Sequence, residues 1–295
     1  MSPRSKTGRQ MVRSIAAATL GRTRRISRTN PFAQVEVNHY TLAHPSVDDR
    51  TQGLTVAHLT DIHYGPWVRG PQIEMLVAYV NAQEVDLVTL TGDYVGHRRR
   101  DIAPCLEPMG DFVAPTFATL GNHDHVASAR ETWRVFETIG VPVLTNEATV
   151  FRSQQGHELT LVGVDDAFTR HHDVPRAFAK ADTDSRFCLT LSHVPEIGPD
   201  LANHGADLIL SGHTHGLQFD TRFVRRLARR IGMTLIMGDY LLNDASMLYV
   251  SQGLGSDLFP WRYRTRPEIA IFRLVEGTEP ILSLEHQRFL DLTHR

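Results

Sequence analysis

The sequence predicts an α/β fold arranged as one domain, residues 34–295, that follows a basic tail, residues 1–33. Short apolar runs rich in β-branched residues recur along the chain, segments with helical spacing lie between them, and polar clusters follow many of the runs. Strands that alternate with helices are typical of layered α/β proteins. The 295 residues are 41% hydrophobic and 22% charged, a composition that is ordinary for a soluble globular protein.

The apolar runs predict buried strands, because each is short and is closed by polar or turn-forming residues. One further run, residues 34–42, precedes the first of them and predicts an added edge strand. The predicted buried strands are Leu54–Leu59, Leu87–Leu90, Phe117–Leu120, Leu159–Val164, Phe187–Leu191, Leu208–Leu210, Met247–Val250 and Ile269–Leu274.

Two segments between these runs, residues 72–81 and 127–139, have the spacing of helices, and Gly140 ends the second. A third segment, residues 221–231, combines five Arg with apolar residues at helical spacing. It is either a solvated helix with an Arg-rich face or an amphipathic element that rests on anionic lipid or brackets an acidic substrate. Its apolar residues are Phe223, Val224, Leu227, Ala228 and Ile231.

The amino-terminal tail is strongly basic. Residues 1–30 carry eight Lys or Arg and no acidic residue, whereas the rest of the chain has 23 basic and 33 acidic residues. Three interpretations fit the tail: a disordered basic arm, contact with an anionic membrane surface, or a cleaved targeting peptide.

No run of about 18 apolar residues occurs, so we expect no transmembrane helix. The two cysteines, Cys105 and Cys188, provide no disulfide framework and suit a reducing compartment. We therefore expect a cytoplasmic protein, with peripheral contact at the inner face of the membrane through residues 1–30 and 222–230.

Residue types that bind metals follow directly on predicted strands at five places. In α/β folds this edge of the sheet is where sites are built. Any one of these short patterns occurs by chance, but the set of five argues against coincidence. We expect their glycines to adopt positive φ at the sharp turns from strand end to ligand. The clusters are Asp61-Ile62-His63, Gly92-Asp93, Gly121-Asn122-His123-Asp124, Ser192-His193 and Gly212-His213-Thr214-His215.

This ligand chemistry fits hydrolysis of phosphate esters. Two divalent cations about 3.5–4 Å apart supply a strong nucleophile and absorb charge on the phosphoryl oxygens. Carboxylates and imidazoles without thiolates suit Mn, Fe or Zn, and a bridging carboxylate offsets the repulsion between two cations. A structural zinc site is disfavoured, because such sites usually use closed sets of Cys and His.

The ordered series of clusters resembles the calcineurin-like metallophosphoesterases. The resemblance implies a four-layer α/β/β/α sandwich with two central mixed β-sheets and two divalent metal ions above the sheet edges. We expect Mn²⁺ in the site, with Fe, Zn or Co as alternatives. The ligands implied for one metal are Asp61, His63, Asp93 and His215, and those for the other are Asp93, Asn122, His193 and His213.

The same resemblance implies that a hydroxide between the metals attacks phosphorus in line. His123 would protonate the leaving oxygen or stabilise the transition state, and Asp124 would orient His123. A His held by a carboxylate keeps one tautomer, and its charged form is favoured beside an anion.

A narrower resemblance covers roughly residues 35–275 and is to the bacterial branch of YkuE-like and YaeI-like phosphodiesterases, related to UDP-2,3-diacylglucosamine pyrophosphatases. Residues 35–43, 54–65 and especially 248–255 carry it, with Arg262 and the segment 267–269. Family members usually have Gly-Gly-Gln after the last ligand, whereas this chain has Gly216-Leu217-Gln218 followed by the Arg-rich segment.

This branch implies a phosphodiesterase or pyrophosphatase. One substrate candidate is UDP-2,3-diacylglucosamine or another phospholipid-type compound, which the basic segments suit. The alternative is a broad-specificity phosphodiesterase or phosphatase on nucleotide-type substrates, and a remote one is a non-catalytic metal-binding scaffold, although scaffolds usually lose ligands. We expect no nucleic-acid partner, because the predicted body is acidic and shows no basic groove with interleaved aromatics.

Overall fold

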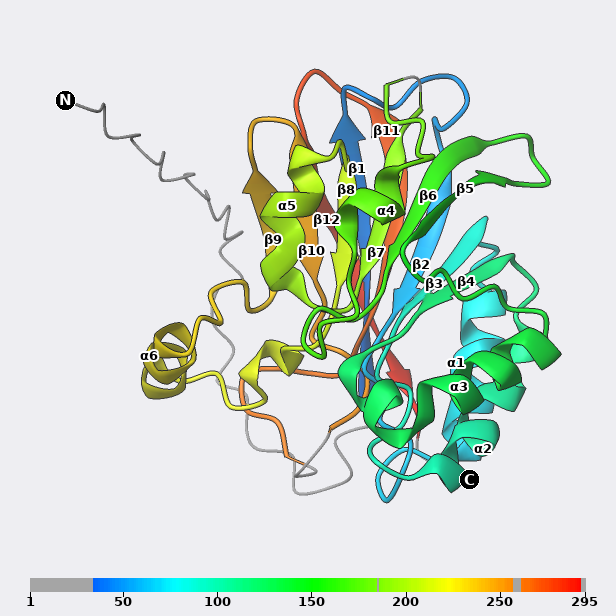
Figure 1. Ribbon diagram of the computed structural model, residues 1–295, viewed down its shortest axis with the longest axis vertical. Coiled ribbons are helices and arrows are strands. Elements are labelled where there is room, and N and C mark those ends of the chain that lie inside the picture. The colour runs from blue at the N-terminus through cyan, green and yellow to red at the C-terminus, as the bar shows by residue number, and fades with distance from the viewer. Residues whose placement is uncertain (1–33, 185, 257–260, 293–295) are drawn as a thin grey trace.

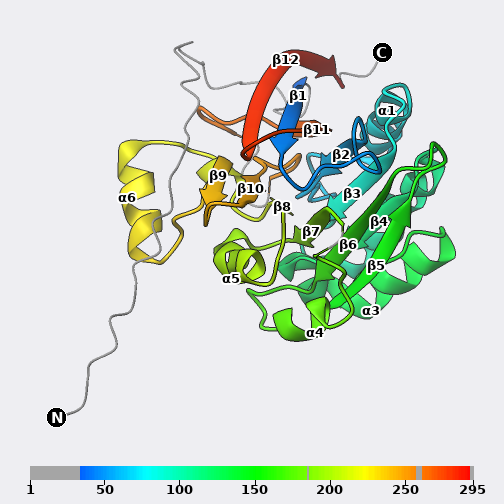
Figure 2. The same cartoon turned by 90° about the horizontal axis from the view of Figure 1, so that it is seen from above.

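The computed structural model describes residues 34–184, 186–256 and 261–292. Two six-stranded mixed sheets pack face to face, and helices cover their outer faces (Figure 1, Figure 2). The predicted four-layer α/β/β/α sandwich is therefore confirmed. The predicted tail, residues 1–33, lies outside the described residues, so its character stays a prediction.

In the first sheet, β2, β3 and β4 run parallel at one side, and α1, α2 and α3 cover the outer face (Figure 1). Its strand order is β12 (Ile281–Asp291), β1 (Gln34–His44), β11 (Glu268–Glu276), β2 (Thr55–Leu59), β3 (Leu87–Thr91) and β4 (Thr116–Thr119). The helices are α1 (Gly70–Asn81), α2 (Ile102–Leu106) and α3 (Asn122–Thr138).

The second sheet has four adjacent parallel strands, β6, β7, β8 and β10, and carries α4 and α5 on its outer face. Its order is β5 (Glu147–Arg152), β6 (Glu158–Val164), β7 (Cys188–Ser192), β8 (Leu208–Ser211), β10 (Ser246–Val250) and β9 (Gly238–Leu242). These two helices are α4 (Val174–Phe178) and α5 (Gly198–Asn203). A further helix, α6 (Arg222–Arg230), follows β8 in the chain. The 3₁₀ turns of the described chain are Arg99–Asp101, Glu107–Asp111, Pro195–Ile197 and His215–Leu217.

Each central strand contributes to two apolar cores, because successive side chains of a strand point to opposite faces. Val56 and Leu87 lie between the two sheets, whereas their neighbours Ala57 and Val88 lie under the helices of the first sheet. A third core lies between the second sheet and α4 and α5. Two-sided burial explains why the strands read as short continuous apolar runs.

The predicted elements are all present, but one was placed wrongly. The segment 34–42 forms β1, which is not an edge strand, because β12 pairs with it on the side away from β11. β12 is exposed along most of its length, so it lacks the apolar run by which the other strands are recognised. α3 begins at Asn122, five residues before the predicted start, where Asp124 caps the backbone N–H of Gly121 at 2.9 Å. A kink at Ser128 (φ 170°, ψ 95°) divides it, and the part after the kink matches the predicted helix.

Among the described residues, no helix is long and apolar enough to cross a bilayer. Cys105 and Cys188 are both free and buried.

The core between the sheets predicts a stability test. Phe272 is fully buried there, and its ring centroid lies 5.5 Å from that of Tyr40 and 5.0 Å from that of Tyr249. We expect Phe272→Ala to lower the free energy of unfolding in urea by about 3–5 kcal/mol, because it leaves a cavity between the sheets. Phe223→Ala, on the exposed helix α6, is the matched control and should change it by less than about 0.5 kcal/mol; equal losses would contradict the layer assignment.

Candidate metal centre

The predicted metal ligands follow the carboxyl ends of parallel strands in both sheets. Because the two sheets pack face to face with these ends at the same edge, loops far apart in the sequence converge there. The seven side chains, with the strand that precedes each, are Asp61 and His63 (β2), Asp93 (β3), Asn122 (β4), His193 (β7), and His213 and His215 (β8).

The structure brings these side chains together as groups whose ligand atoms lie within 4.8 Å of one another. In the first group, His63 Nε2 lies 3.0 Å from His215 Nε2, which lies 3.5 Å from Asp61 Oδ1. In the second, His193 Nε2 lies 3.2 Å from both Asp93 Oδ2 and His213 Nδ1. The groups are Asp61, His63 and His215; His63, Asp93 and His123; and Asp93, His193 and His213.

Asp93 lies between the two sets. Its Oδ2 is 3.6 Å from His63 Nε2 and 3.2 Å from His193 Nε2, and its Oδ1 accepts the backbone N–H of His123 at 2.8 Å. Asn122 joins the second set, since its Oδ1 lies 3.2 Å from His193 Nε2. One carboxylate thus faces imidazoles from both sheets.

The protonation states of the imidazoles suit cation binding. Burial lowers the pKa of His63 to about 3, and burial together with the Arg262 guanidinium lowers the pKa of His215 well below its usual value. Burial and His193 also lower the pKa of His213. These three side chains are therefore neutral at pH 7, the form in which imidazole binds metals.

His193 and Asp93 behave as a buried ion pair. Although burial opposes it, Asp93 raises the pKa of His193 to about 10, and His193 and then His63 lower the pKa of Asp93 against its burial. His193 Nδ1 lies 2.7 Å from the carbonyl oxygen of Thr91, so Nδ1–H donates there and Nε2 is directed at Asp93. A cation bound beside Nε2 would displace the proton on that nitrogen, and the donor set therefore fits a divalent metal.

The glycines of the clusters serve two different purposes. Gly92 has the expected positive φ of 90°, but Gly121 has φ −107°. A Cβ at Gly121 would meet Asp93 Oδ1 at 2.3 Å, and one at Gly212 would meet Asp61 Oδ2 at 2.1 Å. These two glycines allow the carboxylates to approach the backbone closely. We had expected positive φ at the glycines and not this close approach.

Five of the predicted ligands adopt the left-handed backbone conformation. Non-glycine residues rarely adopt positive φ, and such strain concentrates at functional sites. The five are Asp61 (53°), His63 (47°), Asp93 (54°), His213 (70°) and His215 (50°).

The hydrogen bonds of Asp124 differ from those expected for a residue that orients the His123 ring. Its carboxylate accepts the backbone N–H groups of Asp93 at 2.8 Å, Gly121 at 2.9 Å and Tyr94 at 3.1 Å, and among the described residues it makes no hydrogen bond to the imidazole of His123. As the third residue of α3, its side chain turns back to the amides before the helix. Asp124 therefore holds the Asp93 loop in place.

His123 is oriented instead by a backbone carbonyl. Its Nδ1 lies 2.8 Å from the oxygen of Gly96 and 3.2 Å from Nδ1 of His97. The His123 ring lies between those of His63 and His97, with centroids 4.8 Å and 4.7 Å away. Every residue has a backbone carbonyl, so the sequence cannot indicate which one contacts His123.

Arg262 is a site residue to which the sequence assigned no role. The guanidinium is buried, donates to the carbonyl oxygens of Gln252 at 2.6 Å and Gly253 at 3.3 Å, and places Nη2 3.4 Å from His215 Nδ1. A Cβ at Gly253 would meet the Cβ of Asp61 at 2.6 Å. Arg262 thus holds the loop that packs on Asp61.

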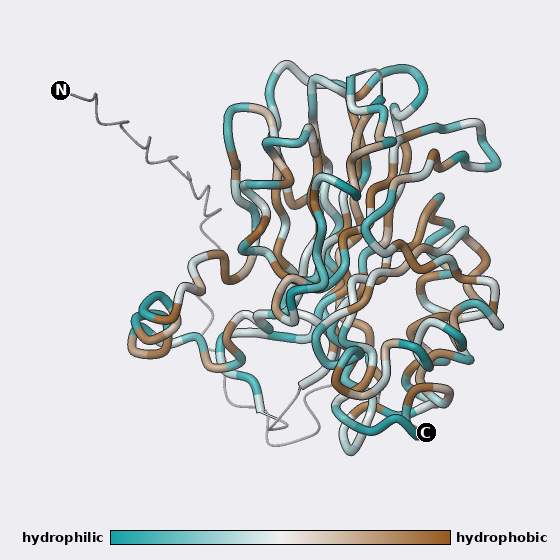
Figure 3. Tube along the Cα trace, in the orientation of Figure 1, coloured by the Kyte–Doolittle hydropathy of each residue, from teal (hydrophilic) through white to brown (hydrophobic). Residues whose placement is uncertain are grey.

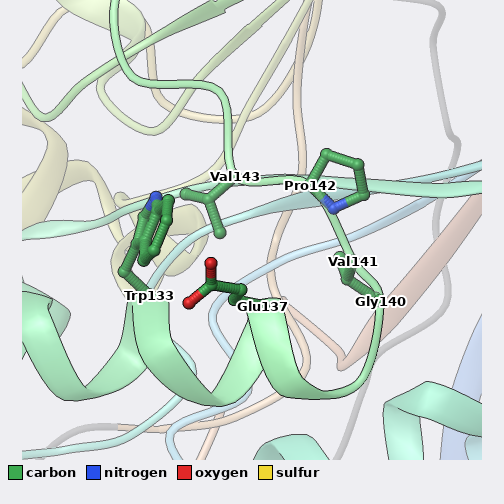
Figure 4. Close-up of a pocket in the computed structure, with 6 residues that line it drawn as sticks. All are labelled: Trp133, Glu137, Gly140, Val141, Pro142 and Val143. Carbon is green, nitrogen blue, oxygen red and sulfur yellow. The ribbon is translucent and has the colours of Figure 1, made fainter.

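A separate hollow of about 310 Å³ lies at the carboxyl end of α3 (Figure 4). It contains none of the predicted site residues, so we assign it no part in the chemistry. Its lining residues are Trp133, Glu137, Gly140, Val141, Pro142 and Val143.

Residues 54–217 match the model of the calcineurin-like phosphoesterase family. An uncharacterized metallophosphoesterase of Helicobacter pylori is 29% identical over 237 residues, which are 78% of this chain and 62% of that protein. Phosphodiesterase YaeI of Escherichia coli is 29% identical over 234 residues, 77% of this chain and 84% of YaeI. The metallophosphoesterase YkuE of Bacillus subtilis is 23% identical over 249 residues, 81% and 85% of the two chains.

These relatives agree with the bacterial branch predicted from the sequence. The chain spans only 62% of the Helicobacter pylori relative and 52% of a transmembrane metallophosphoesterase-domain protein of Danio rerio. Since the family model covers more than half of the 295 residues, this protein belongs to the calcineurin-like phosphoesterase family.

Proposed function

We propose that the protein is a dinuclear metal-dependent phosphodiesterase or pyrophosphatase. The observation that carries the proposal is the position of Asp93, whose Oδ2 lies within 3.6 Å of His63 Nε2 and 3.2 Å of His193 Nε2. This carboxylate lies between two sets of imidazoles, as expected for a ligand that would bridge two cations. Membership of the family and the phosphodiesterase name of the YaeI relative support the same reaction class.

Two divalent cations, when bound, supply Lewis acidity at the phosphoryl oxygens and lower the pKa of water. We propose Mn²⁺, and Fe, Zn and Co accept the same oxygen and nitrogen ligands. The residues that would hold one cation are Asp61, His63, Asp93 and His215, and those for the other are Asp93, Asn122, His193 and His213.

His123 would supply the proton that the leaving oxygen takes up. The Gly96 carbonyl accepts from Nδ1, which leaves Nε2 as the atom that can give up a proton. The 2.8 Å bond from its backbone N–H to Asp93 Oδ1 ties the position of His123 to the ligand shared by both sets. Asp124 acts through the same loop, as a positioning residue for Asp93.

We propose a lipid-linked phosphodiester or pyrophosphate as substrate, with UDP-2,3-diacylglucosamine as the compound to test, acted on in the cytoplasm at the inner face of the membrane. The Arg-rich α6, which follows the last ligand His215 by a short loop, favours a substrate at an anionic surface. The second candidate is a nucleotide-type diester without acyl chains.

Removing the shared ligand should abolish activity. In the Mn²⁺-reconstituted protein, we expect Asp93→Ala to lower kcat/KM for bis-p-nitrophenyl phosphate by more than about 100-fold, because even residues that only support a ligand cost about 10–100-fold. Bound metal should fall in parallel, measured by elemental analysis. Treatment of the wild type with a chelator should have the same effect, and Mn²⁺ should reverse it.

The control for Asp93→Ala is Asp101→Ala, which changes an aspartate outside the ligand groups. Wild-type protein that binds two metal ions yet hydrolyses neither the diester nor p-nitrophenyl phosphate, and releases no UMP from the lipid substrate, would instead indicate a metal-binding scaffold.

The proton donor can be tested through the leaving group. We expect His123→Asn to lower kcat by about 10²–10⁴-fold for an alkyl phosphodiester, because the leaving alkoxide needs a proton. The loss should be smaller for a p-nitrophenyl diester, whose leaving group departs without help, and bound metal should stay at the wild-type level. An equal loss on both substrates would remove His123 from proton transfer.

Release of UMP from UDP-2,3-diacylglucosamine, measured with Mn²⁺ present, distinguishes the substrate candidates. We expect a kcat/KM at least about tenfold above that for UDP-N-acetylglucosamine, because contacts to the acyl chains add to substrate binding. Equal turnover of the two compounds would favour a nucleotide-type substrate. No release of UMP beside good hydrolysis of the generic diester would exclude this lipid.

A further inference from the structure

The helix α6 stands apart from the two sheets, beyond β9 (Figure 1, Figure 2). Ala228 is the one residue of the helix that is buried, and the five Arg line an open hollow along it. Apolar and polar positions lie side by side around the helix (Figure 3). A helix inside a domain would bury its large apolar side chains, whereas α6 leaves Phe223 and Leu227 exposed.

Three large apolar side chains of this segment are exposed. Phe223 is 73%, Leu227 51% and Ile231 71% exposed, and they lie at i, i+4 and i+8, which places them along one face. We call these three residues the apolar stripe. Of the large hydrophobic residues exposed in the described part of the chain, no other three follow one another at this helical spacing.

Arginines border the apolar stripe. At 100° per residue, Arg226 and Arg230 lie next to Phe223 and Leu227 around the helix, and Arg222 lies beyond them. Arg225 pairs with Asp220, Nη2 to Oδ2 at 2.9 Å. Within the described residues, no carboxylate pairs with the other four arginines. The charge beside the stripe is therefore available to an external anion.

Both ends of the α6 segment are anchored at the metal centre. Thr214, which lies between the ligands His213 and His215, donates its hydroxyl to the carbonyl oxygen of Ile236 after the helix. Before the helix, Phe219 pairs with Tyr263, the neighbour of the Arg262 that contacts His215. The orientation of α6 thus determines how the metal centre faces any surface on which the helix rests.

We propose that α6 docks on an anionic lipid bilayer, with the apolar stripe inserted at the level of the headgroups and Arg222, Arg226 and Arg230 on lipid phosphates. Exposed apolar side chains bordered by arginine are what an interfacial helix requires. A nucleic acid would use the arginines but leave the apolar stripe in water. The second step, that docking turns the metal centre toward lipid-linked substrates, rests on the proposed phosphoesterase function.

The test is sedimentation of the full chain with vesicles of phosphatidylglycerol and phosphatidylcholine in equal parts, and with vesicles of phosphatidylcholine alone. We expect binding to the anionic vesicles that weakens as salt is added. Replacing Arg226 and Arg230 with Gln should weaken it about thirtyfold, since each arginine near such a surface contributes about a factor of five. Phe223→Ser with Leu227→Ser should weaken it about tenfold or more.

The matched control is Arg176→Gln with Lys180→Gln, which removes the same charge from exposed positions in and just after α4, and it should bind as the wild type does. Wild-type binding by both α6 variants would overturn the proposal and assign the contact to another part of the chain, such as the basic residues 1–30. Binding to a single-stranded oligonucleotide, lost in the Arg variant but kept in the Ser variant, would overturn it in favour of a nucleic acid.

Hydrolysis of bis-p-nitrophenyl phosphate separates this proposal from the proposed function. We expect both α6 variants to hydrolyse that water-soluble diester at the wild-type rate, because the helix holds no metal ligand. Loss of vesicle binding with unchanged diester hydrolysis would support docking by α6. Vesicle binding by a wild type without hydrolysis would leave docking intact and refute the phosphoesterase function alone.

Discussion

The site depends on one electrostatic constraint, the burial of the Asp93 carboxylate among imidazoles from two sheets. A buried carboxylate is costly unless cations or N–H donors surround it. Here His193 and His63 face one oxygen and the backbone of His123 donates to the other. The strand ends, the capped start of α3 and the close approach at Gly121 all serve to place this carboxylate.

The fold brings these side chains together with short loops and limited backbone strain. Parallel strands end at the same edge, so loops after β2, β3, β7 and β8 meet without long excursions. Part of the free-energy cost is backbone strain, since five of the predicted ligands adopt left-handed φ. Three apolar cores, one between the sheets and one under the helices of each sheet, form the rigid frame that holds these strained residues in place.

The molecule combines two kinds of surface chemistry. At the candidate metal centre, most polar side chains are buried and several are held by a backbone atom, such as the Thr91 or Gly96 carbonyl. At α6 the opposite holds, because Phe223 and Leu227 are exposed beside arginines of which, in the described structure, only Arg225 pairs with a carboxylate. Buried charge suits bound cations, and exposed apolar groups beside free charge suit an interface between water and lipid.

The sequence by itself determined the layered α/β class, the buried strands and the set of metal-type residues. Strands buried on both faces are continuous apolar runs, and the clusters at their ends are recognised by their Asp, Asn and His residues. It did not determine that β1 is interior, since its partner β12 is mostly exposed and carries no apolar run. Nor did it determine the partners of Asp124 and His123, which are backbone groups brought near only by folding. Local patterns specify elements and chemistry, whereas contacts between distant loops exist only once the sheets have packed.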